Sequence, residues 1–369
     1  MKKINSIIVL YVMKSKMRKF QILVIFSFLN SINFFSQEFL KEFVSINEFI
    51  KAENQSFFIA NDGVHGEELW RTDGTKEGTT LVKGIYKGAT SSSVSNLFYY
   101  NNKLYFSAND GIYGQELWVT DGKEENTKLL KNIYTYVKQS SNPRGFVAFE
   151  NEIYFLAADD NISGYQDIWK TDGTESGTIK IYEANTSRGN LFVANNLLYF
   201  TQGTKLYKVN LSNNSLIEIN VDEYYSLSEF NVFNDEIYFI SHTNYRQNIR
   251  LYRIDKDENL VLLKEYNQPQ YGDIDIDNFT YLNSHLYYSI RTDFNSSQDT
   301  DVLWKTDGTA ANTKAVKSFG WDRHYSGSHI SNFTIYKDKI YFNGGSKNGF
   351  KMWASDGTTE GTLEFLKQQ

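Results

Sequence analysis

The sequence predicts an all-β fold, a seven-bladed β-propeller whose four-stranded antiparallel blades each take about 47 residues. Three observations predict it: a tryptophan motif recurs along the chain, aromatic residues that favour strands are abundant, and helical periodicity is lacking. Aromatic residues make up 16% of the chain, with 26 Tyr and 27 Phe, whereas Pro occurs only twice. Together with a hydrophobic fraction of 41%, this composition predicts packed strands around a sizeable core.

The repeat is a Leu-Trp-x-Thr-Asp-Gly-Thr motif with five clear copies about fifty residues apart. One interval, from Trp169 to Trp304, is close to three repeats long and leaves room for two degenerate copies. Leu206-Tyr207 and Leu251-Tyr252 keep the Leu-aromatic pair without Asp-Gly-Thr, which brings the count to seven. The motif residues expected to be structural are Trp70, Asp73, Gly74, Trp118, Asp121, Gly122, Trp169, Asp172, Gly173, Trp304, Asp307, Gly308, Trp353, Asp356 and Gly357.

Each repeat carries four short strand signals separated by turn signals. In the second repeat these are Asn96–Tyr100, Leu104–Ala108, the motif itself, and Lys128–Ile133. Four short antiparallel strands per unit are typical of a propeller blade. A single propeller is therefore expected to span residues 38–369.

The Asp-Gly pairs are predicted to form turns rather than a ring of metal sites. An Asp carboxylate can accept a backbone N–H two residues on, and Gly supplies positive φ without steric cost. The Trp side chains are expected to be buried between neighbouring blades. The loops around Asp62-Gly63 and Asp110-Gly111 are predicted to be turns as well, with calcium binding as the alternative.

These repeats resemble the ELWxxDGT-repeat proteins, a family of exported bacterial polypeptides. The resemblance covers roughly residues 45–369, with five good and two decayed copies of the motif. It implies an extracytoplasmic, propeller-like repeat domain, and it implies no particular biochemical activity.

Residues 1–37 are predicted to be an export signal peptide, which is cleaved after Gln37. They contain six Lys or Arg and no acidic residue, and the apolar run Phe20–Leu29 is too short to span a bilayer. No stable membrane span is therefore expected after signal removal. A second apolar run lies upstream, so translation is expected to begin at Met13 or Met17, with a membrane anchor formed from both runs as the alternative.

Charge and cysteine content restrict the function classes. Beyond residue 37 the chain carries 32 basic and 44 acidic residues, a net charge of −12, which argues against nucleic acid as a partner. Cysteine is absent, which excludes disulfides, thiolate metal sites and cysteine nucleophiles. We expect a monomer in the periplasm or outside the cell.

The candidate ligand-binding residues lie in one segment that departs from the repeat, Trp321, Arg323, His324 and Tyr325. Two aromatic rings, a cation and an imidazole suit contact with a sugar or a peptide, with a locally packed loop as the alternative. The alternating run of acids from Asp273 to Asp277 lacks the Gly and Glu of a calcium loop, and an exposed face before a strand is expected there. No metal site or cofactor is predicted, and calcium is kept as an alternative.

No catalytic residues are identified, since phosphate-loop, zinc-protease and serine-hydrolase motifs are missing from the sequence. The leading hypothesis is a non-catalytic binding or scaffolding propeller for a glycan or a protein. One alternative is a carbohydrate-active propeller enzyme, a lyase or glycosidase, because 44 acidic residues leave a catalytic carboxylate pair open. A second alternative is an adhesin or extracellular matrix component.

Overall fold

The computed structural model divides the chain into two compact units, Met1–Leu191 and Phe192–Gln369, and we describe each by itself. The structure describes residues 8–14, 20–26, 39–136, 139–159, 165–187, 189–203, 205–221, 226–242, 248–267, 272–294, 300–320, 330–346 and 349–365.

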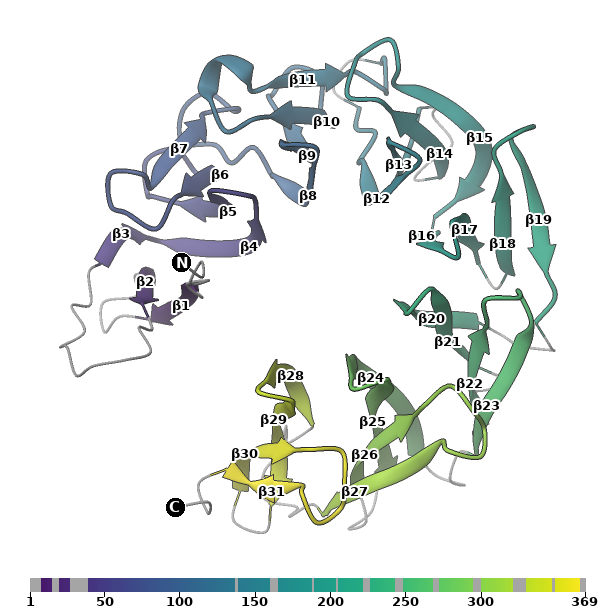
Figure 1. The fold of residues 1–369 in the computed structure, drawn as a ribbon. Coiled ribbons are helices and arrows are strands. Elements are labelled where there is room, and N and C mark those ends of the chain that lie inside the picture. Colours follow the sequence, from purple (N-terminus) through teal and green to yellow (C-terminus); the bar gives the residue numbers. More distant parts are fainter. Residues whose placement is uncertain are drawn as a thin grey trace, which may run out of the picture. The chain divides into compact units, whose positions relative to one another are not determined.

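The first unit begins with a small antiparallel sheet in the order β1-β2-β3, and three four-stranded sheets follow it (Figure 1). Each of the three is an antiparallel blade, and a single turn of 3₁₀ helix, η1, lies in the second. The elements are β1 (Ile8–Lys14), β2 (Phe20–Phe26) and β3 (Phe39–Phe43); blade 1 with β4 (Ser45–Lys51), β5 (Ser56–Asn61), β6 (Glu67–Thr72) and β7 (Thr80–Lys83); blade 2 with β8 (Ser95–Tyr100), β9 (Lys103–Asn109), β10 (Gln115–Thr120), η1 (Glu124–Asn126) and β11 (Lys128–Lys131); and blade 3 with β12 (Arg144–Phe149), β13 (Glu152–Ala157), β14 (Gln166–Thr171) and β15 (Ile179–Thr186).

The second unit contains four more blades of the same design, and the first strand of blade 4 begins one residue before the boundary. Its strands are β16 (Leu191–Ala194), β17 (Leu197–Gln202), β18 (Lys205–Asn210) and β19 (Ser215–Ile219) in blade 4; β20 (Ser226–Phe233), β21 (Glu236–His242), β22 (Asn248–Ile254) and β23 (Leu260–Asn267) in blade 5; β24 (Gly272–Leu282), β25 (His285–Phe294), β26 (Thr300–Thr306) and β27 (Lys314–Gly320) in blade 6; and β28 (Ser331–Tyr336), β29 (Lys339–Ser346), β30 (Gly349–Ser355) and β31 (Leu363–Glu364) in blade 7.

The motif tryptophan pairs with an aromatic residue of the second strand in each clear repeat. In blades 4 and 5, Tyr207 pairs with Phe200 and Tyr252 pairs with Phe239, so both tyrosines occupy the tryptophan's place in the register. The two degenerate copies are therefore complete blades. The tryptophan pairs are Trp70 with Phe58, Trp118 with Phe106, Trp169 with Phe155, Trp304 with Tyr288, and Trp353 with Phe342.

Hairpin geometry explains how the first two strands of a blade are joined. In blades 2 to 7 both central residues of this hairpin have positive φ, as type I′ turns require, because their twist matches that of the flanking strands. Asn is frequent there since it tolerates the left-handed region. The pairs are Asn101-Asn102, Glu150-Asn151, Asn195-Asn196, Asn234-Asp235, Asn283-Ser284 and Lys337-Asp338.

One sequence expectation is wrong in its placement. The acidic run from Asp273 to Asp277 does not precede a strand but lies inside β24. The buried Ile274 and Ile276 alternate with these acids, so the period-2 pattern of a strand accounts for the run. The side chain of Asp275 pairs with Arg291 on the neighbouring β25.

The strand β3 packs against blade 1. The ring of Phe43, 1% exposed, meets Trp70 edge-on with centroids 4.9 Å apart, and the Lys41 ammonium lies 4.0 Å from the centroid of the Trp70 ring. In the second unit the fourth strand of one blade makes the same pair of contacts with the tryptophan of the next blade. Those contacts are Lys264 and Tyr266 with Trp304, and Lys317 and Phe319 with Trp353.

The likeness between β3 and these fourth strands extends to their sequences, because Lys41-x-Phe43 matches Lys264-x-Tyr266 and Lys317-x-Phe319. Residues 39–43 therefore act as a copy of the repeat's fourth strand, placed ahead of blade 1. The predicted signal peptide, residues 1–37, ends before this strand and includes β1 and β2; its function as an export signal stays a prediction.

Candidate functional site

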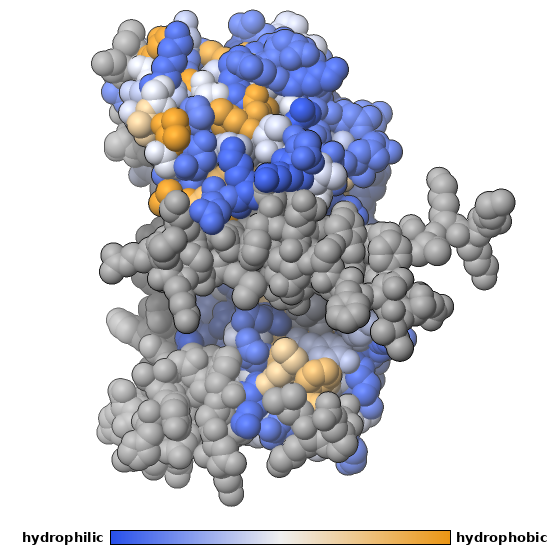
Figure 2. All heavy atoms as spheres, turned by 90° about the vertical axis from the view of Figure 1, so that its left-hand side faces the viewer, coloured by the Kyte–Doolittle hydropathy of each residue, from blue (hydrophilic) through white to orange (hydrophobic). Residues whose placement is uncertain are grey.

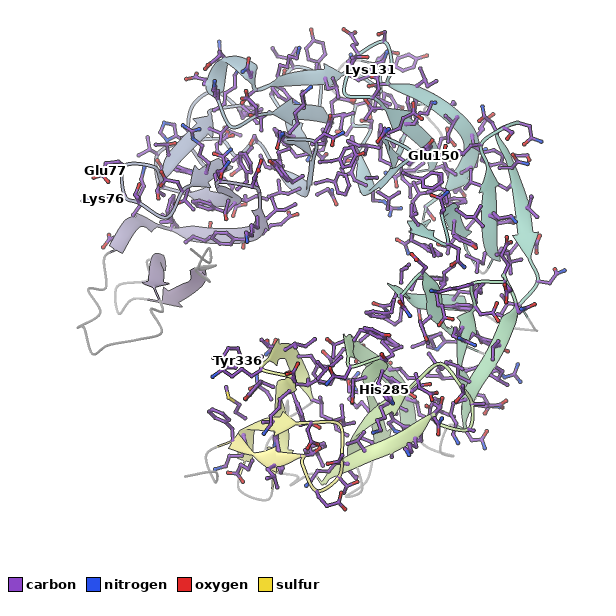
Figure 3. All side chains as sticks on the ribbon, viewed as in Figure 1. Lys76, Glu77, Lys131, Glu150, His285 and Tyr336 are labelled. Carbon is purple, nitrogen blue, oxygen red and sulfur yellow. The ribbon has the colours of Figure 1, made fainter. Side chains whose placement is uncertain are left out.

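The predicted motif aspartates anchor the turns between the third and fourth strands. In blade 1, Oδ1 of Asp73 accepts the Thr75 backbone N–H at 2.9 Å and the Thr75 hydroxyl at 2.7 Å. These hydrogen bonds lower the pKa of Asp73 below its ordinary value, and the carboxylate stays ionised. Lys76 and Glu77 at the tip of this turn project away from the strands (Figure 3). The motif aspartates of blades 3, 6 and 7 make the same two contacts, to Thr174, Thr309 and Thr358.

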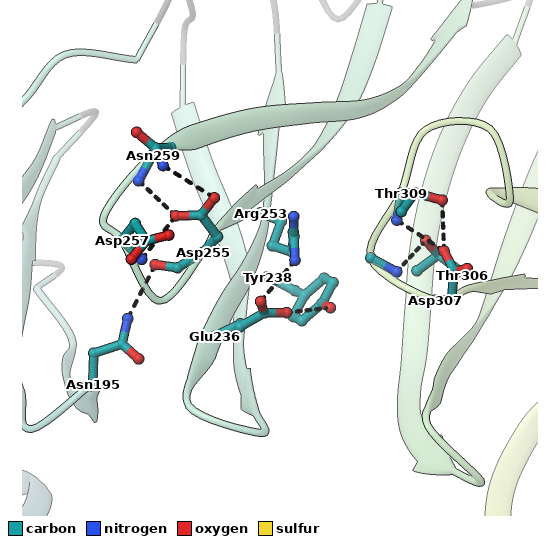
Figure 4. A network of polar contacts seen from close by, with 11 residues as sticks. Asn195, Glu236, Tyr238, Arg253, Asp255, Asp257, Asn259, Thr306, Asp307 and Thr309 are labelled. Carbon is teal, nitrogen blue, oxygen red and sulfur yellow. Dashed lines mark hydrogen bonds and ion pairs between the residues drawn. The ribbon is translucent and has the colours of Figure 1, made fainter.

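The degenerate blade 5 keeps this anchor without Gly or Thr. Oδ1 of Asp255 accepts the backbone N–H groups of Asp257 at 3.0 Å and Asn259 at 2.8 Å (Figure 4). The turn chemistry therefore survives in blade 5 although the motif has been lost from its sequence.

A second part of the motif is a pair of buried hydroxyls that the sequence analysis did not single out. The hydroxyl residue before each motif Asp, a Thr in four copies and Ser355 in blade 7, meets a Thr seven residues later. In blade 6 the Oγ1 atoms of Thr306 and Thr313 lie 2.8 Å apart. Both side chains are buried, and Thr306 also accepts the Gly308 N–H at 3.0 Å. The recurring seven-residue spacing was the sequence signal for this contact.

The glutamate that opens the motif in blades 1 and 2 was also missed. The Glu116 side chain is fully buried, and its carboxylate accepts the Ile133 N–H at 2.7 Å, the Ser141 N–H at 3.1 Å and the Ser141 hydroxyl at 2.7 Å. Glu68 makes the matching contacts in blade 1. Burial raises the pKa of both carboxyl groups to about 7. The glutamates thus tie the third strand to the segment that leads into the next blade.

The predicted ligand segment cannot be placed. Trp321, Arg323, His324 and Tyr325 lie outside the residues that the structure describes. Among the described residues, no cluster of three His, Asp or Glu side chains is arranged to hold a metal ion.

A cavity of about 370 Å³ lies between blades 1 and 2, on the side where the hairpins of the first two strands and the Asp-Gly turns gather. Its wall includes three carboxylates, those of Glu53, Asp73 and Asp121, and one guanidinium, that of Arg71. A cavity of this size is at the lower end of the range for small-molecule sites. We take it as the candidate site.

Amides and one aromatic ring complete the polar wall. Asn54 and Gln55 come from the β4–β5 hairpin, and Asn102 comes from the equivalent hairpin of blade 2. The Tyr99 hydroxyl donates to Oδ1 of Asn102 at 3.2 Å, and Nε2 of Gln55 donates to the Asp121 carbonyl at 3.3 Å. The wall therefore combines groups that only donate, groups that only accept, and groups that do both.

The cavity is located where the repeat is broken. At the matching position of the second strand, blades 2 to 7 carry a tyrosine, and blade 1 carries Phe57. Where blades 2 and 3 meet, the Tyr105 hydroxyl lies against the motif glycine Gly173, and the cavity there is only about 70 Å³. Where blades 1 and 2 meet, the Gln55 amide lies against Gly122 instead. The β4–β5 hairpin also lacks the positive-φ pair of the other six blades.

The cavity's motif carboxylates are suited to accept hydrogen bonds. Burial raises the pKa of Asp121, but hydrogen bonds from the Lys123 N–H and the Asn126 amide outweigh this and lower its pKa overall. Asp73 is held ionised by Thr75 as described above. Ionised carboxylates accept hydrogen bonds and cannot donate a proton to a leaving group at neutral pH.

Apolar side chains are exposed elsewhere on the first unit, at the loops between the second and third strands. Val64 is 64% exposed and Ile112 is 61% exposed. In Figure 2 the face of the first unit turned to the viewer is mainly hydrophilic, with hydrophobic residues in small patches. Within the described part of the chain, no helix is long and apolar enough to cross a membrane.

Comparison with known proteins gives likenesses of structure only, because neither a family model nor a curated protein matches this chain. A puromycin-hydrolysing peptidase of Mycobacterium tuberculosis is similar over 86% of this chain and 53% of its own, at 9% identity and a TM-score of 0.50. An oligogalacturonate lyase in complex with manganese matches at 13% identity over 86% and 88% of the two chains, with a TM-score of 0.47. The β-propeller domain of the Trilobed protease from Pyrococcus furiosus matches at 10% identity over 86% and 96%, with a TM-score of 0.43.

The chain spans about half the length of the puromycin-hydrolysing peptidase, and about half the length of a prolyl endopeptidase and a puromycin hydrolase to which it is also similar. At such low identity these likenesses concern the fold and carry no activity over. Among the residues that the structure describes, seven four-stranded antiparallel sheets follow one another, and the predicted fold class, a seven-bladed β-propeller, is confirmed.

Proposed function

We propose that this protein is an exported binding propeller whose ligand occupies the cavity between blades 1 and 2. In this proposal residues 1–37 direct export and are removed, and residues 38–369 form the mature propeller. The proposal places the chain with the exported ELWxxDGT-repeat proteins that its motif resembles.

One observation carries the binding role. The cavity of about 370 Å³ lies between blades 1 and 2, where the Gln55 amide rather than a second-strand tyrosine lies against the motif glycine, and its wall is polar and charged. The motif residues themselves are engaged in turns and core contacts, so they explain the stability of the blades. The cavity wall also includes side chains outside the motif, such as those of Glu53 and Asn54, which can contact a ligand.

Binding is favoured over catalysis by the state of the two motif carboxylates. The pKa values of Asp73 and Asp121 are both lowered, so neither is prepared to act as a general acid near neutral pH. Their hydrogen bonds to turn residues also fix them as acceptors. The two motif carboxylates therefore offer a ligand hydrogen-bond acceptors and do not supply a general acid.

Two measurements test the proposal. N-terminal sequencing of the exported protein should give a chain that begins at Glu38; a chain that keeps residues 1–37 in the exported fraction would refute the processing. For the binding role, the purified protein is screened against arrayed glycans, and the hits are repeated with Asn54→Ala. Loss of binding in this variant supports the cavity as the site, whereas unchanged binding places the ligand elsewhere.

A further inference from the structure

We infer that the ligand of the blade 1–blade 2 cavity is an uncharged saccharide; this rests on the binding function proposed above. The cavity wall presents three kinds of hydrogen-bonding group within one small volume. Glu53 and Asp73 carry acceptors only, Arg71 carries donors only, and Asn54 carries both. Sugar hydroxyls both donate and accept, so a ligand with several hydroxyls can pair with each kind.

The polarity of the wall disfavours an apolar ligand. Such a ligand would bury carboxylate, guanidinium and amide groups without giving them partners, and each unpaired group costs free energy. The Tyr99 ring is half-buried and lines the cavity, held by its hydroxyl to Asn102. It offers one aromatic surface to the C–H groups of a sugar ring.

The charge of the wall disfavours an anionic ligand. Three carboxylates and one guanidinium leave the wall with an excess of two negative charges, and like charges brought together across an interface are repulsive. Uronates and sulfated sugars should therefore bind more weakly than neutral sugars of the same length. A cationic peptide would be attracted by the three carboxylates and repelled by Arg71, so an oligolysine is included among the probes.

The test uses the purified protein and four kinds of probe. These are neutral oligosaccharides (gluco-, manno- and galacto-), an oligogalacturonate, a sulfated oligosaccharide and an oligolysine peptide. Titration calorimetry is run in EDTA, so that divalent cations do not contribute. We expect binding to at least one neutral oligosaccharide and affinities at least tenfold weaker for the charged probes.

Two variants connect the binding to the cavity. Glu53→Gln and Asn54→Ala alter exposed side chains of the β4–β5 hairpin, and each should weaken binding of the neutral probe at least tenfold. The matched control is Lys103→Ala, at the smaller cavity between blades 2 and 3, which should change affinity less than twofold. Phe57→Tyr restores the tyrosine of the other blades, whose hydroxyl lies against the motif glycine where Gln55 lies in blade 1. It should weaken binding by displacing the Gln55 side chain from the cavity wall.

The outcomes separate the two proposals. Preference for the uronate, the sulfated sugar or oligolysine, with loss in Asn54→Ala, overturns the neutral saccharide and leaves the cavity as a binding site. Both proposals are overturned if all the variants retain binding, or if none of the probes binds. Circular dichroism of each variant establishes that a loss of binding is not a loss of fold.

Discussion

Truncation of Phe43 tests whether β3 is a structural part of the folded protein. Its ring is 1% exposed and meets Phe58 at 5.6 Å and Trp70 at 4.9 Å, both edge-on. Core Phe→Ala substitutions cost about 3–5 kcal/mol, and edge-to-face aromatic pairs contribute about 0.5–1.5 kcal/mol each. We therefore expect Phe43→Ala to lower the free energy of unfolding by about 3–5 kcal/mol.

The assay is urea denaturation followed by tryptophan fluorescence, with two reference variants. Phe49→Ala removes a ring that is 38% exposed and also stacks on Phe58, so it should cost much less than Phe43→Ala. Phe319→Ala removes the equivalent ring beside Trp353 and should cost about as much as Phe43→Ala. A Phe43→Ala loss no larger than that of Phe49→Ala would refute the assignment of β3 as a fourth-strand copy.

Three further predictions concern the repeat itself. Gly78→Ala places a Cβ against the Asp73 carboxylate and should lower the free energy of unfolding by about 1–3 kcal/mol, whereas the Cβ of the control Gly84→Ala meets nothing within 4 Å and should be neutral. Equal changes in the thermal unfolding midpoint of the two variants would contradict this. Thr306→Val leaves the Thr313 hydroxyl and the Gly308 N–H without this partner and should lower the free energy of unfolding, measured by urea denaturation, by about 1–3 kcal/mol. An unchanged free energy would show that the hydroxyl pair contributes nothing. Burial raises the folded-state pKa of Glu116 from 4.5 to about 7, so its stabilising contribution is complete below pH 4.5 and is lost as pH rises towards 7, by up to about 3 kcal/mol. Urea midpoints measured from pH 4 to 8 should therefore vary less with pH in Glu116→Gln than in the natural protein, and parallel pH profiles would refute this.

The strands and turns were predictable because their chemistry is local. Alternating apolar residues, Asn-rich hairpins and an Asp-Gly pair each act within a few residues, and each recurs with the repeat. The same regularity located two blades whose motif had decayed, since Tyr207 and Tyr252 preserved the aromatic position.

The candidate site was not predictable in this way. Trp321 and its neighbours stand out in the sequence because they depart from the repeat, and they lie outside the described residues. Phe57 also departs from the repeat, in a position where six blades carry tyrosine, but a Tyr→Phe difference gives no hint of a ligand by itself. The buried role of Glu116 was likewise hidden, because its partners stand 17 and 25 residues further along.

The sequence by itself determined the number of blades, the strands within them and the chemistry of their turns, because these depend on neighbours along the chain. The tertiary structure decided which side chains share a cavity and which carboxylates are buried. Glu53, Arg71, Tyr99 and Asp121 line one cavity only because blades 1 and 2 pack side by side. Phe43 meets Trp70 only because β3 packs against blade 1. Contacts between blades join residues about fifty positions apart, and a repeat motif does not encode the side chains that vary at those contacts.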